Sequence, residues 1–203
     1  MSTTVVERWR YLIIAAVAMI DCVGADGFGA PTKVAFLGDG TPVVADGYRN
    51  ARIALLRRGG GVAAAWGTQG RADGEFDLPH GVAVDADDRI YVADRDNARI
   101  QVFARDGTHR ATWSGAAMGR PFAVSVRGER VYVVDGGDQD PENPAARVVV
   151  LDREGRVLGQ FGSYGTAAGQ LAEPHDLAVD ERGWVYVAEL GTNRIQRFRP
   201  RSP

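Results

Sequence analysis

The sequence predicts an all-β protein of the β-propeller type, in which about four short antiparallel sheets surround an axis. Three observations support this prediction: apolar residues fall in short runs that alternate with polar residues, Asp- and Gly-containing turns separate the runs, and one pattern recurs four times. Runs with a period of two are typical of strands, and a repeat of roughly 40–50 residues is typical of units that bury their faces against each other. No helical run of about 10–15 residues separates the copies, which argues against a parallel α/β sheet.

Each copy opens at a proline and contains three strand-like runs. The opening prolines are Pro31, Pro79, Pro121 and Pro174, so the copies begin 48, 42 and 53 residues apart (31 to 79, 79 to 121, 121 to 174). A fourth, outer run follows in the first three copies: Val62–Trp66, His109–Trp113 and Val157–Phe161. We therefore expect a propeller over residues 26–203 with repeats at 31–66, 79–113, 121–161 and 174–200, incomplete relative to a six-bladed ring.

The composition is that of a globular protein, and the charge balance does not indicate a basic surface. Hydrophobic residues make up 45% and charged residues 25% of the chain, and the formal net charge is −2. Nucleic-acid binders usually carry a strongly basic face, so we expect no nucleic-acid partner and rank RNA binding last among the functions considered. With Cys22 as the single cysteine, an internal disulfide is impossible.

Residues 1–25 differ from the rest and read as a leader. Arg8 and Arg10 precede an apolar run, Tyr11–Ile20, and small residues follow at Val23–Ala25. This order resembles a secretory signal peptide, and the run is too short for a stable membrane span. We expect a secreted or periplasmic protein; the alternative is a mis-assigned start on a cytoplasmic protein.

Two of the three histidines occupy equivalent places. His80 and His175 each follow the opening proline of a copy, where the other two copies carry Thr32 and Phe122. The first strand of a propeller blade is the innermost, so these positions should converge near the axis. Alternation around a six-bladed ring would supply three imidazoles, which is a catalytic zinc arrangement. The alternative is that both histidines are polar caps on the channel.

The repeated pattern Pro-x-x-(apolar)-Ala-(apolar)-Asp, then Tyr-Val-Ala-Asp, then Asn-x-Arg-Ile-x-x-Phe resembles the NHL repeat over residues 27–200. Five segments further resemble the catalytic propeller of the peptidyl-α-hydroxyglycine α-amidating lyases: 46–52, 78–80, 93–101, 137–141 and 173–176. The resemblance implies a six-bladed propeller with an axial zinc on three histidines and a structural calcium. It also implies cleavage of a peptidyl-α-hydroxyglycine into a peptide amide and glyoxylate.

By this resemblance, His80 and His175 would be zinc ligands and Asp176 would contact the calcium. Tyr48 would remove a proton from the substrate, and Arg95 would be an active-site arginine. Zinc lowers the pKa of a bound hydroxyl, and an arginine can hold a carboxylate through two parallel hydrogen bonds, so these residue types suit the reaction.

The chain departs from the family pattern at three points. The copy that would carry the third histidine has no counterpart, and four copies are fewer than six. Glu173 stands where the family usually has Met, and its carboxylate would either repel the substrate or act as a replacement ligand.

Acidic residues elsewhere are expected to be structural. One follows the second strand of every copy and predicts a turn-closing hydrogen bond to backbone: Asp46, Asp94, Asp135 and Glu189. Three more lie in an insertion of the third copy, where a solvated loop is favoured over a cation site: Asp138, Asp140 and Glu142.

The sequence thus favours an exported, zinc-dependent lyase that acts on a peptide-like small substrate. The rival is a non-catalytic NHL propeller that binds a peptide or a protein partner. Four blades would either close into a ring or remain an open arc, whose unpaired edges would favour self-association.

Overall fold

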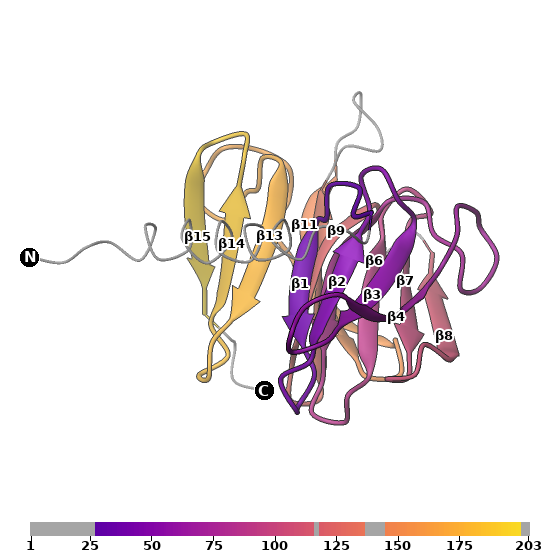
Figure 1. Cartoon of the computed structure of the whole chain (residues 1–203). Helices are drawn as coiled ribbons and strands as arrows, with labels where there is room; N and C mark the ends of the chain where they lie inside the picture. Colours follow the sequence, from indigo (N-terminus) through magenta and orange to yellow (C-terminus); the bar gives the residue numbers. More distant parts are fainter. Residues whose placement is uncertain (1–26, 116–117, 137–144, 200–203) are drawn as a thin grey trace, which may run out of the picture.

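The computed structural model describes residues 27–115, 118–136 and 145–199, and these form fifteen strands in four sheets, with no helix among them (Figure 1). Blade 1 holds β1 (Lys33–Phe36), β2 (Pro42–Asp46), β3 (Arg52–Leu56) and β4 (Val62–Trp66). Blade 2 holds β5 (Pro79–Val84), β6 (Ile90–Asp94), β7 (Arg99–Phe103) and β8 (His109–Ser114). Blade 3 holds β9 (Pro121–Arg127), β10 (Arg130–Gly136), β11 (Ala146–Asp152) and β12 (Val157–Phe161). Blade 4 holds β13 (Pro174–Val179), β14 (Val185–Glu189) and β15 (Arg194–Phe198).

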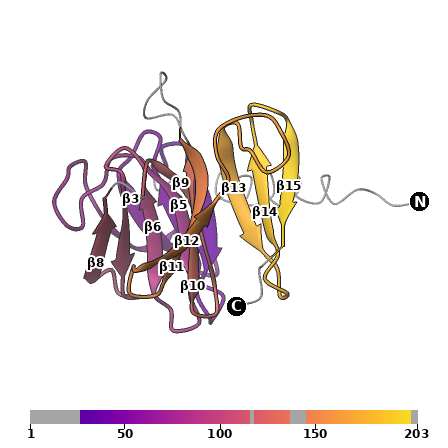
Figure 2. The same cartoon turned by 180° about the vertical axis from the view of Figure 1, so that it is seen from behind.

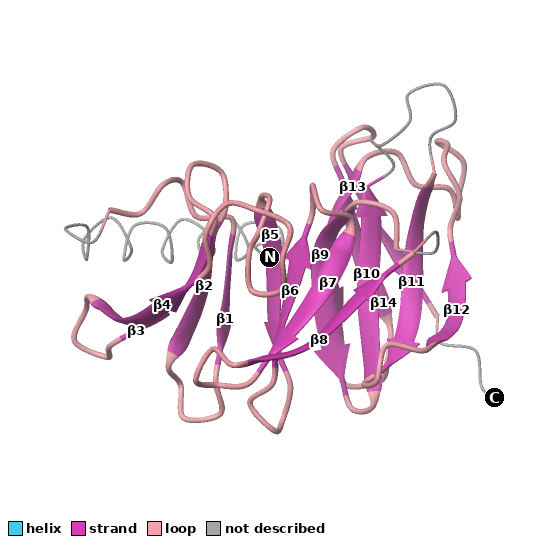
Figure 3. Cartoon of the chain, turned by 90° about the vertical axis from the view of Figure 1, so that its right-hand side faces the viewer, coloured by secondary structure: helices cyan, strands magenta, loops and turns pink. Residues whose placement is uncertain are grey.

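Each blade is an antiparallel meander whose strands pair in chain order. Figure 2 shows the blades from behind, with β9 and β13 adjacent, and Figure 3 shows that the described chain consists of strands and loops. The all-β propeller prediction is confirmed. The three outer strands were also predicted correctly, apart from one further residue at the end of β8.

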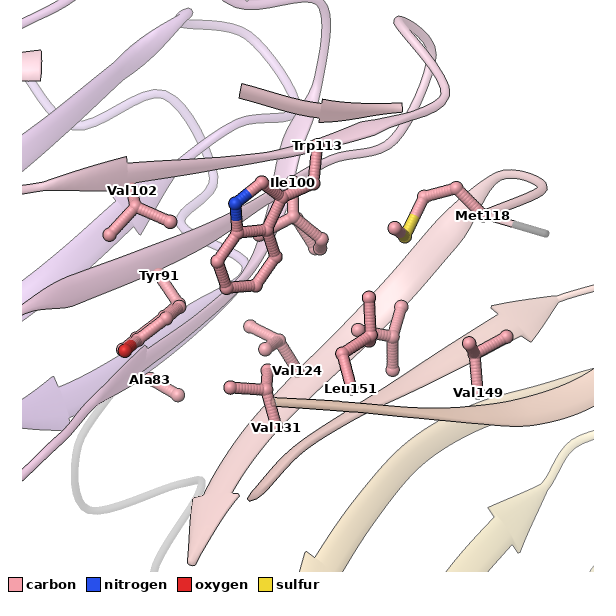
Figure 4. Packing of buried hydrophobic residues seen from close by; sticks show 12 residues of the cluster. Ala83, Tyr91, Ile100, Val102, Trp113, Met118, Val124, Val131, Val149 and Leu151 are labelled. Carbon is pink, nitrogen blue, oxygen red and sulfur yellow. The ribbon is translucent and has the colours of Figure 1, made fainter. Parts of the chain in front are cut away.

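Blades pack through alternating faces of their strands. In β6, Ile90 and Val92 face blade 1, whereas Tyr91 and Ala93 face blade 3. The contact between blades 2 and 3 also buries Trp113, as Figure 4 shows. Because each central sheet is apolar on both faces, burial between neighbours stabilises the stack.

The inner strands follow one another around the axis: β1 lies against β5, β5 against β9, and β9 against β13. Between blades 1 and 4, the ammonium group of Lys33 forms an ion pair with the carboxylate of Asp176. Within the described residues, blade 4 has three strands, so β15 is its outer strand there. Self-association through such an edge stays a prediction.

The recurring acidic residues accept backbone hydrogen bonds as predicted, but the donors lie in the segment before each blade, 15 to 17 residues away in the sequence, and not within a turn. Asp94, fully buried, accepts hydrogen bonds from the backbone N–H of Asp77 at 2.7 Å and from three side chains, those of Asn97, Arg99 and Gln101. Backbone N–H groups likewise donate to Asp46, Asp135 and Glu189. The part played by Arg99 was not predicted: its guanidinium also donates to three connector carbonyls, those of Arg71, Ala72 and Glu75. This network fastens the connector before blade 2 to the blade itself.

Candidate functional site

A β-bulge opens the inner strand of three blades. In β5, pairing passes from Pro79 opposite Asp94 to Gly81 opposite Ala93, so His80 has no residue opposite it. The same interruption leaves two further residues out of the pairing, Phe122 in β9 and His175 in β13. A bulge turns an unpaired residue out of the regular alternation, which explains how these three side chains reach the axis.

The three bulge residues meet ring to ring. The ring centroids of His80 and His175 are 4.8 Å apart. The ring centroid of Phe122 lies 5.1 Å from that of His80 and 5.2 Å from that of His175. The predicted convergence of the two histidines is therefore correct. Phe122, which the sequence analysis gave no role, occupies the third corner of the triangle.

The surroundings of His80 fix its protonation. Nδ1 lies 2.7 Å from the carbonyl oxygen of Phe122, and a carbonyl only accepts, so Nδ1 carries the proton. In the neutral ring Nε2 is then an acceptor, and the Tyr48 hydroxyl donates to it over 3.2 Å. The structure thus joins a 54% exposed tyrosine to a 5% exposed histidine.

Both imidazoles are held in the neutral form. Burial lowers the pKa of His80 to about 4; nearby positive charge on Arg95 acts in the same direction, while the hydrogen bond to Phe122 opposes it. Burial also lowers the pKa of His175. Neutral imidazole is the form that ligates a metal ion.

Arg95 lies over the face of the Phe122 ring, which contacts both histidines. Its guanidinium carbon is 4.0 Å from the centroid of Phe122, a cation–π contact, and its side chain is 16% exposed. Arg95 follows β6 directly, and its backbone N–H donates to the carbonyl of Leu78. The predicted arginine is thus beside the histidine pair, positioned by Phe122.

The described residues supply two of the ligands that a catalytic zinc ion needs. Two neutral imidazoles come together, but catalytic zinc takes three protein ligands. Within residues 27–115, 118–136 and 145–199, no group of three His, Cys, Asp or Glu side chains could hold a metal ion. Glu173 is exposed, at a backbone φ of 51°, and does not complete such a group with the histidines.

Calcium fits the same region poorly. Asp176 accepts the backbone N–H of Leu177 on Oδ1 at 2.8 Å and pairs with the Lys33 ammonium through Oδ2. Calcium takes six to eight oxygen ligands, whereas a cation already lies on this carboxylate. The residues present therefore do not match a calcium site.

The remaining residues singled out from the sequence are accounted for as follows. His109 lies in the outer strand β8, where it bonds the Thr112 hydroxyl and packs on Phe103. The insertion carboxylates and the predicted leader lie outside the described residues. No helix in the described part of the chain is long and apolar enough to cross a membrane.

The packing around Phe122 leads to a prediction. A Cβ at Gly136 would stand 2.2 Å from the Phe122 ring, so Gly136→Ala must displace it. We expect a loss of about 1–3 kcal/mol in the free energy of unfolding, measured by urea denaturation. Gly159→Ala is the matched control, since its added methyl meets no atom within 4 Å; an equal loss in both variants would contradict the prediction.

Comparison with known proteins agrees with this fold. The NHL repeat family matches residues 76–103 and 171–198, which span the inner three strands of blades 2 and 4. Peptidyl-α-hydroxyglycine α-amidating lyase 1 of Drosophila melanogaster is 32% identical over 196 residues, covering 86% of this chain and 36% of that protein. NHL repeat-containing protein 3 of Mus musculus is 33% identical over 161 residues, covering 76% and 45%.

Solved structures show the same fold. Virginiamycin B lyase from Staphylococcus aureus superposes with a TM-score of 0.61 at 15% identity, over 81% of this chain and 50% of that one. A chain of the nidogen/laminin complex superposes with a TM-score of 0.63 at 21% identity, over 84% of this chain and 61% of that one. The chain spans half or less of the curated relatives named above. It is an NHL-repeat propeller whose sequence, over the part they share, resembles that of the peptidyl-α-hydroxyglycine α-amidating lyases.

Proposed function

We propose that this propeller carries a lyase site that converts a peptidyl-α-hydroxyglycine into a peptide amide and glyoxylate. The observation that supports it is the meeting of Tyr48, His80 and His175, from three different blades, at the axial bulges. In this reaction the substrate hydroxyl loses its proton, the C–N bond breaks, and the amide nitrogen gains a proton.

Each side chain suits one part of that reaction. The exposed Tyr48 hydroxyl lies at the histidine pair, 3.2 Å from His80 Nε2, and as its phenolate it can accept the proton of a substrate hydroxyl. Arg95, beside the same rings, can bind the substrate carboxylate. The Phe122 carbonyl keeps the proton of His80 on Nδ1, which leaves the Nε2 lone pair as the one that can bind a metal ion.

His80 and His175 would hold the zinc ion, with the remaining ligand supplied from outside the described residues. When bound, zinc would supply Lewis-acid activation of the substrate hydroxyl. Added zinc is expected to raise the melting temperature of the protein by about 5–10 °C at saturation. His80→Gln and His175→Gln should each abolish the rise, whereas His109→Gln, on the outer strand, should retain it; loss in all three variants would contradict the assignment.

Turnover tests the role of the tyrosine. With an α-hydroxyglycine peptide and chromatographic detection of the amide, Tyr48→Phe is expected to lower kcat by about 10²–10⁴-fold. Tyr164→Phe is the matched control, because Tyr164 is 51% exposed, close to the 54% of Tyr48, but lies in the connector before blade 4. The proposal fails if the zinc-supplemented protein shows no turnover, or if both variants match the unaltered protein.

A non-catalytic role in binding a peptide or protein partner is the second candidate. The observation in its favour is that the described residues supply two imidazoles and no third ligand. Saturable peptide binding without turnover or zinc response would favour it over the lyase.

A further inference from the structure

Lys33 and Asp176 occupy one equivalent position in two blades. Each stands two residues after its opening proline, where blades 2 and 3 carry Gly81 and Ala123. A Cβ at Gly81 would lie 2.9 Å from the Ala123 Cα, so small residues let β5 and β9 approach closely. The position therefore presents charged side chains only from blades 1 and 4, and these two meet.

Each oxygen of the Asp176 carboxylate has a partner. Its Oδ1 accepts the Leu177 N–H at 2.8 Å, and its Oδ2 pairs with the ammonium of Lys33. Both side chains are about one-third exposed, at 30% for Lys33 and 34% for Asp176. A second cation at this carboxylate would have to displace the ammonium or stand beside it against like-charge repulsion.

We infer that Lys33 supplies the positive charge which the family resemblance assigns to a calcium ion at Asp176, and that this internal cation joins blade 1 to blade 4. The lysine brings one charge and three N–H donors on its own stem, so the contact needs no set of six to eight oxygen ligands. The inference concerns the axial site of the proposed lyase, but its test involves neither zinc nor turnover.

The experiment measures melting temperature with calcium and with a calcium chelator. The unaltered protein should melt at the same temperature in both. Lys33→Met and Asp176→Asn should each lower that temperature by about 1–3 °C, and the double variant by less than the sum, because the two residues form one pair. Lys33→Asp places two carboxylates together and should lower it further.

Calcium then distinguishes the outcomes. It should raise the melting temperature of Lys33→Asp by about 5–10 °C at saturation, because a cation again joins the two carboxylates. Lys33→Asp combined with Asp176→Asn is the matched control and should not respond. The inference is overturned if the unaltered protein gains stability from calcium in an Asp176-dependent way, if the two single effects add fully, or if Lys33→Asp does not respond. A protein without lyase activity could still give every expected result here.

Discussion

Replacing Arg99 by methionine is expected to lower the free energy of unfolding by about 3–5 kcal/mol, because it leaves a buried carboxylate without its cation. Asp94 is fully buried, and its Oδ2 accepts from Arg99 Nε at 2.6 Å. The arginine also donates to three connector carbonyls, which would lose these bonds: those of Arg71, Ala72 and Glu75. Urea denaturation monitored by tryptophan fluorescence measures the loss.

Blade 4 offers a matched control for this change. Arg194 makes the same kind of contacts, to Glu189 and to connector carbonyls, but its side chain is 29% exposed against 9% for Arg99. Water can partly replace the Arg194 guanidinium, so Arg194→Met should lower the free energy of unfolding by about 1–2 kcal/mol. Equal losses at the two sites would show that burial does not set the cost. Asp94→Asn added to Arg99→Met should recover part of the loss, because it removes the unpaired charge.

Trp113→Ala is expected to lower the free energy of unfolding by about 3–5 kcal/mol, the second large effect. Trp113 is 8% exposed and packs between blades 2 and 3 with Tyr91, at a centroid distance of 5.7 Å (Figure 4). Its ring lies over Gly155 of blade 3, where even a Cβ would come within 2.5 Å. Removing the indole therefore leaves a cavity between blades 2 and 3, and filling it would require the backbone of one blade to move.

Trp184→Ala provides the comparison. Trp184 is half-buried and contacts Arg197, whose guanidinium carbon lies 4.2 Å from the ring centroid. An exposed cation–π contact contributes about 0.5–1 kcal/mol, so this substitution should cost about 1 kcal/mol. Calorimetry of both variants would contradict the packing argument if the two melting temperatures fell equally.

The fold could be predicted because one pattern is repeated. A run such as Ile90–Asp94 is ambiguous alone, but equivalent runs in four copies with the same turns fix the strands and their order. The meeting of His80 and His175 followed from the same equivalence, since identical positions of different blades share the axis.

The remaining features depend on tertiary structure. Lys33 and Asp176 are 143 residues apart, and nothing local to either indicates that their side chains span the axis. The carbonyls that Arg99 contacts lie in an irregular connector without periodicity to predict its path. Phe122 offered one signal, its position equivalent to the two histidines, but an aromatic ring there suggested no chemistry.

The bulges make the axial position exchangeable. A bulge residue has no pairing partner opposite it in the neighbouring strand, so another side chain can be placed there without shifting the register of the sheet. Different side chains at this one position would alter the chemistry at the axis while the blades keep their pairing. Phe122→His alone would set a third imidazole at the corner now 5.1 Å and 5.2 Å from the two histidines. Evolution of new metal chemistry in this fold could therefore proceed one substitution at a time.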